Sequence, residues 1–239
     1  MLANTRKNIR ELATKQCTFA KEQCTYMKKP KTGRDVEKNE VVSLPTTPPV
    51  PSEADAKIAA IAPLFEEIMN ILGLDTSDEH LRDSPMRVAR TYVSELFAGL
   101  NPALAPDLTT FPNHFQFHSM LVEKNIRLHS VSAIQFLPFS GKVHVGYFPS
   151  RQIIGLSNIH KIADYCARRP QLQEQLTHQI LEALQQALQT PDVIVALDTR
   201  HEGVQSRGVS DHTCGTFSMD YGGKFESAVH RQAFLAALD

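Results

Sequence analysis

A run of apolar residues spaced four apart constrains the fold more than any other feature of the chain. Within QLQEQLTHQILEALQQAL the spacing is kept at Leu172, Leu176, Ile180, Leu184 and Leu188. This spacing places the five side chains on one face of an α-helix, so the segment predicts a helix with one buried side. Pro170 can begin a helix but cannot continue one, which separates this helix from a helical segment before it.

Two more helices are predicted earlier in the chain. One begins at Ser52 and ends at Gly73, with apolar side chains at helical spacing at Ile58, Ile61, Phe65, Ile68 and Leu72. The other lies in RDSPMRVARTYVSELFAGL, where Ser84 is the predicted N-cap and Pro85 the first helical residue. Residues 101–119 contain three prolines and no clear period, which favours a loop with an edge strand.

The remaining segments have strand patterns. IRLHSV and KVHVGYF alternate or are rich in β-branched residues, DVIVALD is a buried-strand pattern, and TCGTFSMD is a weaker one. A short helix is predicted at 229–238. Helices and strands in this order predict an α+β domain in which an antiparallel sheet is backed by a helix pair, with further helices at the N-terminus.

The first fifty residues differ from the rest. They carry ten Lys and Arg against five Asp and Glu, whereas the remainder carries fifteen against twenty-one, so the net charge of -1 hides a basic arm on an acidic body. The arm ends in SLPTTPPVP, a proline-rich linker pattern. We predict a disordered arm at 1–50 and a domain at 51–239. Three interpretations of the arm remain open: a solvated extension, an interaction tail or a transit peptide. Glu11 and Glu22 count against a transit peptide.

Composition excludes several classes of protein. The hydrophobic content of 42% and charged content of 21% are ordinary for a globular chain. No run approaches the roughly 20 apolar residues of a membrane span, and none resembles a signal-peptide core. The four cysteines are scattered, which indicates a reducing compartment, and we expect a cytoplasmic protein with neither a membrane nor a nucleic-acid partner.

Several stretches carry a family resemblance. DSPMRVARTYVSELFAGL, the segment from FLPFSGKVHVGYF to QILEALQQAL, and RHEGVQSRGV keep one order and spacing. Over about residues 55–239 the chain resembles GTP cyclohydrolase I of the tunnelling-fold (T-fold) superfamily. The resemblance implies a T-fold subunit in a homo-oligomeric ring with sites between subunits.

The resemblance also implies a zinc-dependent reaction. In this family a zinc-bound water attacks C8 of guanine, formate leaves, and dihydroneopterin triphosphate forms. Zinc is held by the Cys and second His of a Cys-Glu-His-His motif and by a Cys two residues after a later His. Here the matching positions are Ser132, Gln135 and Gly203. A hydroxyl and an amide are poor zinc ligands and glycine supplies none, so we expect no zinc cofactor.

Other residues offer weak substitutes for that metal site. His129 lies before Ser132, and His212 and Cys214 follow the RGV motif, but none forms the short-spaced pair of a zinc half-site. Nothing in the sequence marks a base that would activate Cys214 as a nucleophile.

The substrate-holding positions are better kept. By resemblance, Glu174 accepts hydrogen bonds from guanine, and six further positions keep a matching role. Arg207 and Ser157 match triphosphate contacts, Lys161 stands where arginine is usual, Arg87 and Arg90 match cations from a neighbouring subunit, and His201 matches the later, proton-transferring His. Asn158 departs from the family's lysine. Each alone has a structural alternative, namely a helix-start carboxylate, a cap or a solvated charge.

These observations predict a family member that keeps a pocket for GTP or a related purine or pterin phosphate but has lost zinc-dependent ring opening. It would act as a binding, regulatory or non-catalytic subunit, either alone or in a ring mixed with an active paralogue. Two alternatives stay open. One is an enzyme with metal-independent chemistry on a purine or pterin through His201; the other is a GTP cyclohydrolase whose zinc is supplied by another arrangement.

Overall fold

The computed structural model describes residues 41–43, 52–207 and 210–239. The chain divides into the units Met1–Lys38 and Asn39–Asp239, and all described residues lie in the second. Most of the predicted arm at 1–50 lies outside the described residues. Within the arm, Val41–Ser43 forms a strand, β1.

A five-stranded sheet forms the centre of the domain, with strand order β6-β3-β4-β7-β8. Its long strands are β3 (Leu121–Ser132), β4 (Pro138–Tyr147), β7 (Val193–His201) and β8 (Thr216–Tyr221), all paired antiparallel. The two-residue strand β6 (Pro170–Gln171) pairs parallel with the end of β3. The predicted strands are therefore confirmed, and β4 is the central strand of the sheet.

A smaller three-stranded sheet has the order β1-β2-β5. β2 (Asp107–Pro112) is the strand predicted within 101–119, and it pairs antiparallel with both β1 and β5 (Gln152–Ile154).

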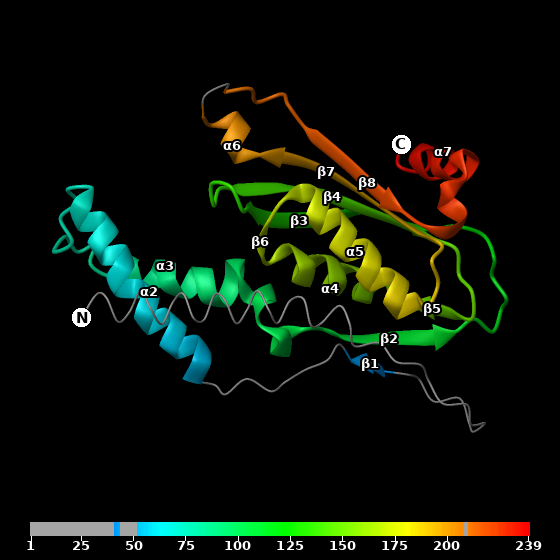
Figure 1. The fold of residues 1–239 in the computed structure, drawn as a ribbon, viewed down its shortest axis with the longest axis horizontal. Helices are drawn as coiled ribbons and strands as arrows, with labels where there is room; N and C mark the ends of the chain where they lie inside the picture. Colours follow the sequence, from blue (N-terminus) through cyan, green and yellow to red (C-terminus); the bar gives the residue numbers. More distant parts are fainter. Residues whose placement is uncertain (1–40, 44–51, 208–209) are drawn as a thin grey trace. The chain divides into compact units, whose positions relative to one another are not determined.

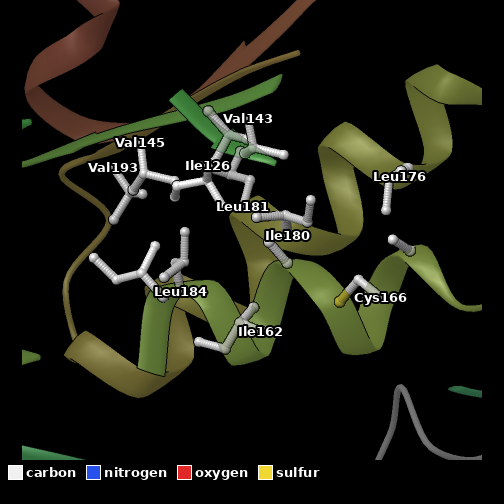
Figure 2. Close-up of a cluster of buried hydrophobic side chains, with 14 of the residues drawn as sticks. Ile126, Val143, Val145, Ile162, Cys166, Leu176, Ile180, Leu181, Leu184 and Val193 are labelled. Atoms are coloured by element: carbon white, nitrogen blue, oxygen red, sulfur yellow. The ribbon is translucent and has the colours of Figure 1, made fainter. Parts of the chain in front are cut away.

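Two helices cover one face of the central sheet. They are α4 (Leu156–Ala167) and α5 (Gln173–Leu188), and Figure 1 shows them side by side under β3 and β4. Figure 2 shows Ile180 and Leu184 of α5 lying between Ile162 of α4 and the valines of the strands, among them Val143. Ile180, Leu184 and Val143 are completely buried, and each such side chain contributes about 1.5–3 kcal/mol by leaving water.

The other face of the sheet carries a smaller apolar cluster. Phe225 and Phe234 are buried there against Ile194 and Ala196 of β7. Phe234 belongs to the C-terminal helix α7 (Ala228–Ala236), close to its predicted bounds.

The N-terminal helices differ in part from expectation. In the predicted apolar stripe of α2 (Ser52–Ile71), Ile68 is 47% exposed and Leu72, just after the helix, is 70% exposed, so this end of the stripe is not buried against the described residues. The next helix is shorter than predicted: α3 (Ser84–Thr91) is followed by a π-helical turn, Tyr92–Leu96, and by short 3-10 turns. Asp83 rather than Ser84 precedes its first turn.

Two predictions near α5 are also corrected. Pro170 begins no helix, because its extended backbone forms β6 beside β3. Leu172 has extended backbone angles at the N-cap and is 38% exposed, so only the later four residues of the stripe are buried. Across the described part of the chain, no helix is both long and apolar enough to cross a membrane.

Candidate functional site

Several of the predicted residues meet at one end of the central sheet. Figure 1 shows the β3–β4 turn, β6 and the short helix α6 (Glu202–Gln205) at this end. The first turn of α5 is placed there by β6, and His201 is the last residue of β7, opposite Phe139 of β4. The turn, the strand end and the helix start come from distant parts of the sequence.

A buried glutamine that the sequence did not single out lies at the centre of this end. Gln173, 3% exposed, is the first residue of α5. Its Oε1 accepts a hydrogen bond from Thr199 Oγ1 at 2.6 Å and lies 2.8 Å from His201 Nε2. Its Nε2 donates to Ser218 Oγ at 2.9 Å and to the carbonyl of Thr216 at 3.1 Å. The amide thus joins α5 to both β7 and β8.

His201 is fixed from a second side by an aromatic ring. Its imidazole stacks on Phe139 with the ring centroids 4.6 Å apart and the planes 12° from parallel. Burial lowers the pKa of His201 below its usual range, and the carboxylate of Glu174 opposes this in part. The imidazole is therefore neutral at physiological pH and can exchange a proton with a ligand.

The three positions matched to zinc ligands also come together here. A β-carbon added to Gly203 would lie 2.9 Å from Gln135 Oε1, so the amide of Gln135 fills the space beside the glycine. Ser132 lies at the base of the same turn, and its Oγ accepts a hydrogen bond from the backbone N–H of Ile134 at 3.3 Å. One hydroxyl and one amide with a glycine do not fit zinc, which binds thiolate, imidazole and carboxylate.

The sequence offers three other candidate metal ligands. His129 is exposed on β3, and His212 and Cys214 are exposed in the segment before β8. Within residues 52–207 and 210–239, no group of three His, Cys, Asp or Glu side chains is placed to hold a metal ion.

Glu174 and Arg207 both face solvent at this end of the sheet. Glu174 follows the buried Gln173 in the first turn of α5, where a carboxylate is favoured by the helix dipole. It is near enough to His201 to act on the imidazole charge. Arg207 is exposed just beyond α6. Both side chains are open to a ligand.

Ser157 and Lys161 lie on α4 away from this end. The C-terminal end of α4 is the end tied to the site, because Ala167 O accepts a hydrogen bond from Ser130 Oγ at 2.7 Å. Ser157 lies near the opposite end of the helix, about 15 Å away at 1.5 Å per residue. Lys161 lies between, on the wall of a cavity of about 270 Å³ that Tyr165 and Arg168 also line.

The other two cationic positions lie on α3. Arg87 and Arg90 are exposed on α3, and Arg87 pairs with Asp83 across 3.5 Å. Asn158, which stands where the family's lysine is expected, is 4% exposed and donates from Nδ2 to the carbonyl of Thr109 at 2.8 Å. Asn158 therefore ties α4 to β2 and does not face a ligand.

Comparison with known proteins identifies the family. The sequence profile described as GTP cyclohydrolase I matches residues 61–239. A protein named GTP cyclohydrolase 1 from Flavobacterium johnsoniae is 42% identical over 181 residues, covering 76% of this chain and 81% of the relative. Proteins of the same name from Salmonella arizonae and Salmonella newport are 40% identical over 196 residues, covering 81% of this chain and 88% of each relative. The antiparallel sheet backed by α4 and α5 agrees with the T-fold of that family. The chain therefore belongs to the GTP cyclohydrolase I family.

Proposed function

We propose that this chain binds GTP, or a related purine or pterin phosphate, at the end of the sheet marked by Glu174 and His201, and that it does not open the guanine ring with zinc. Its role is then that of a binding, regulatory or non-catalytic subunit. Glu174 would accept hydrogen bonds from the donor edge of the heterocycle, which is a charge-assisted contact.

The observation that carries the proposal is the contrast between two sets of residues at one place. Gln135 and Gly203 adjoin each other, and Ser132 uses its hydroxyl on a backbone N–H, so none of the three offers zinc a thiolate or an imidazole. Beside them, Glu174 is open to solvent and His201 is held in a defined orientation. The residues that would recognise the heterocycle are therefore kept at this end of the sheet, whereas the residue types that would bind zinc are not.

We propose that more than one subunit supplies the phosphate contacts. Ser157 lies at the end of α4 away from the site and Arg87 and Arg90 lie on α3, so a neighbouring copy would bring these side chains, with Lys161, to the site in a homo-oligomeric ring. The ring could equally contain an active paralogue. We also propose a cytoplasmic location, on the grounds of the scattered cysteines.

Zinc content and turnover test the proposal. We expect purified protein loaded with zinc and then dialysed to retain far less than one ion per chain and to form no dihydroneopterin triphosphate from GTP. The variant Ser132→Cys/Gln135→His/Gly203→Cys should retain about one zinc per chain, since it restores the ligand types that zinc prefers. The single variant Gly203→Cys is the matched control and should not. One tightly held zinc per chain with product formation in the natural sequence would contradict the proposal.

A second candidate function is metal-independent acid–base chemistry on a bound purine or pterin. It is favoured by the neutral, stacked and hydrogen-bonded His201, which has the features of a proton-transfer residue. A screen of pterins and deazapurines would detect it as turnover that is lost in His201→Ala and kept in His129→Ala, a change at an exposed histidine. Absence of turnover with every heterocycle would leave binding as the function.

A further inference from the structure

We propose that Gln173 is a positioning residue that holds His201 with its hydrogen on Nε2, so that Nδ1 offers a lone pair to a hydrogen-donating group of the ligand. The first half of this inference stands on the free protein. The second half rests on the proposed function, because it requires a ligand at this site.

The orientation of the Gln173 amide follows from its surroundings. On one side lie the carbonyls of Thr216 and Leu197, at 3.1 and 3.4 Å, which can only accept hydrogen bonds. The NH₂ group must therefore face that side, and Oε1 must face Thr199 and His201. Reversing the amide would set its oxygen against two carbonyl oxygens.

The hydrogen position on His201 follows in turn. An amide oxygen only accepts, so His201 Nε2, 2.8 Å from Gln173 Oε1, must carry a hydrogen. The Thr199 hydroxyl donates to the same oxygen at 2.6 Å and so cannot donate to Nε2, from which it lies 3.3 Å away. In the neutral imidazole Nδ1 is then the nitrogen without a hydrogen.

Neither the Gln173 amide nor the His201 imidazole can easily leave this arrangement. Gln173 and Thr199 are 3% and 1% exposed, and leaving a buried polar group without a partner costs about 1–3 kcal/mol. The backbone beneath is fixed too, because Thr177 Oγ1 donates to Gln173 O at 2.9 Å and contacts Ser218 Oγ at 2.7 Å. The stack on Phe139 fixes the plane of the imidazole, and the hydrogen bond from Nε2 to Gln173 Oε1 opposes a flip of the ring within that plane.

The free nitrogen defines the chemistry of what can bind beside it. Within residues 52–207 and 210–239, no side chain or backbone group donates a hydrogen bond to His201 Nδ1. A ring N–H, an amino group, a hydroxyl or a bound water can donate to it, whereas a carbonyl or phosphate oxygen would face a lone pair. Glu174 is the charged group that acts on His201 from a neighbouring element, and it likewise only accepts. Together the two residues select hydrogen-bond donors.

Nitrogen NMR of the full-length, ¹⁵N-labelled protein tests the first half without any ligand. His201→Gln identifies the signals of His201. At neutral pH we expect a protonated, pyrrole-like Nε2 and an unprotonated, pyridine-like Nδ1. In Gln173→Met, a side chain of similar shape without an acceptor oxygen no longer confines the hydrogen of His201 to Nε2, so the two nitrogen signals should move towards each other. Gln186→Met, exposed on the same helix, is the matched control and should leave the signals unchanged.

The outcomes separate the two halves. A hydrogen on Nδ1 in the natural sequence, or unchanged His201 signals in a folded Gln173→Met variant, would overturn the role of Gln173. If Gln173→Met fails to fold, the spectrum of the natural sequence still decides. GTP should then move the Nδ1 signal towards the pyrrole-like range, and binding that leaves it unmoved would overturn the ligand half. Absence of any heat of binding would overturn the ligand half and the proposed function together, with the tautomer result intact.

Discussion

The hydrogen bond between Thr199 and Gln173 allows a quantitative test by a double-mutant cycle. Both side chains are almost fully buried, and Thr199 Oγ1 lies 2.6 Å from Gln173 Oε1. Thr199→Val removes one donor while Gln173 Oε1 keeps His201, so it should destabilise the protein by about 1 kcal/mol. Gln173→Leu should cost more, about 2–4 kcal/mol, because it leaves the Thr199 hydroxyl and the His201 N–H without their acceptor.

The two substitutions should not be additive. Once Thr199 is valine, Gln173→Leu no longer leaves a buried hydroxyl without an acceptor. The double variant should therefore be at least about 1 kcal/mol more stable than the sum of the two single losses in unfolding free energy predicts. Denaturant unfolding at one fixed protein concentration measures this, since an oligomer's stability depends on concentration. Additivity within about 0.3 kcal/mol would refute the hydrogen bond between Thr199 and Gln173 at the start of α5.

Three further predictions follow from buried or paired side chains. Ile180→Ala in the main core should lower the free energy of unfolding by about 2–5 kcal/mol, measured in denaturant, and a loss below 1 kcal/mol would contradict the packing in Figure 2. A hydrogen bond to Asp220 raises the pKa of His178, so its stabilisation is fully present below the ordinary value of 6.5 and is lost as pH rises through the raised pKa. His178→Gln should therefore be less stable than the natural sequence near pH 6 and equal to it at pH 9, and equal stability at both would contradict the pairing. Burial raises the pKa of Cys166 to about 11, so iodoacetamide at pH 8 should modify the exposed Cys214 and not Cys166 in the folded protein, as read by peptide mass spectrometry.

Local patterns predicted the elements of the fold well. The spacing of Leu176, Ile180, Leu184 and Leu188 identified the buried face of α5, since a helical period requires only nearby residues. Leu172 shares the spacing and yet lies before the helix, because β6 keeps the chain extended up to that residue. That pairing with β3 is a long-range contact, which no local period reveals.

The exposed residues of the candidate site could be predicted from the sequence, whereas the buried residues that hold them in place could not. Glu174 and His201 came from a resemblance in motif and order. Gln173 carries no motif, and its role depends on groups from β7 and β8 that meet it only in the folded sheet. The spacing along the chain also could not tell that Ser157 lies on the far part of α4 from Glu174.

Calorimetric titration of the metal-analysed protein with GTP tests the central claim most directly. We predict binding by protein that holds no stoichiometric zinc, a loss of about tenfold or more in affinity in Glu174→Gln, and little change in the matched variant Glu182→Gln, which alters an exposed carboxylate on the same helix. Binding that is equally strong in Glu174→Gln, or no binding of GTP at all, would contradict a recognition pocket at this end of the sheet.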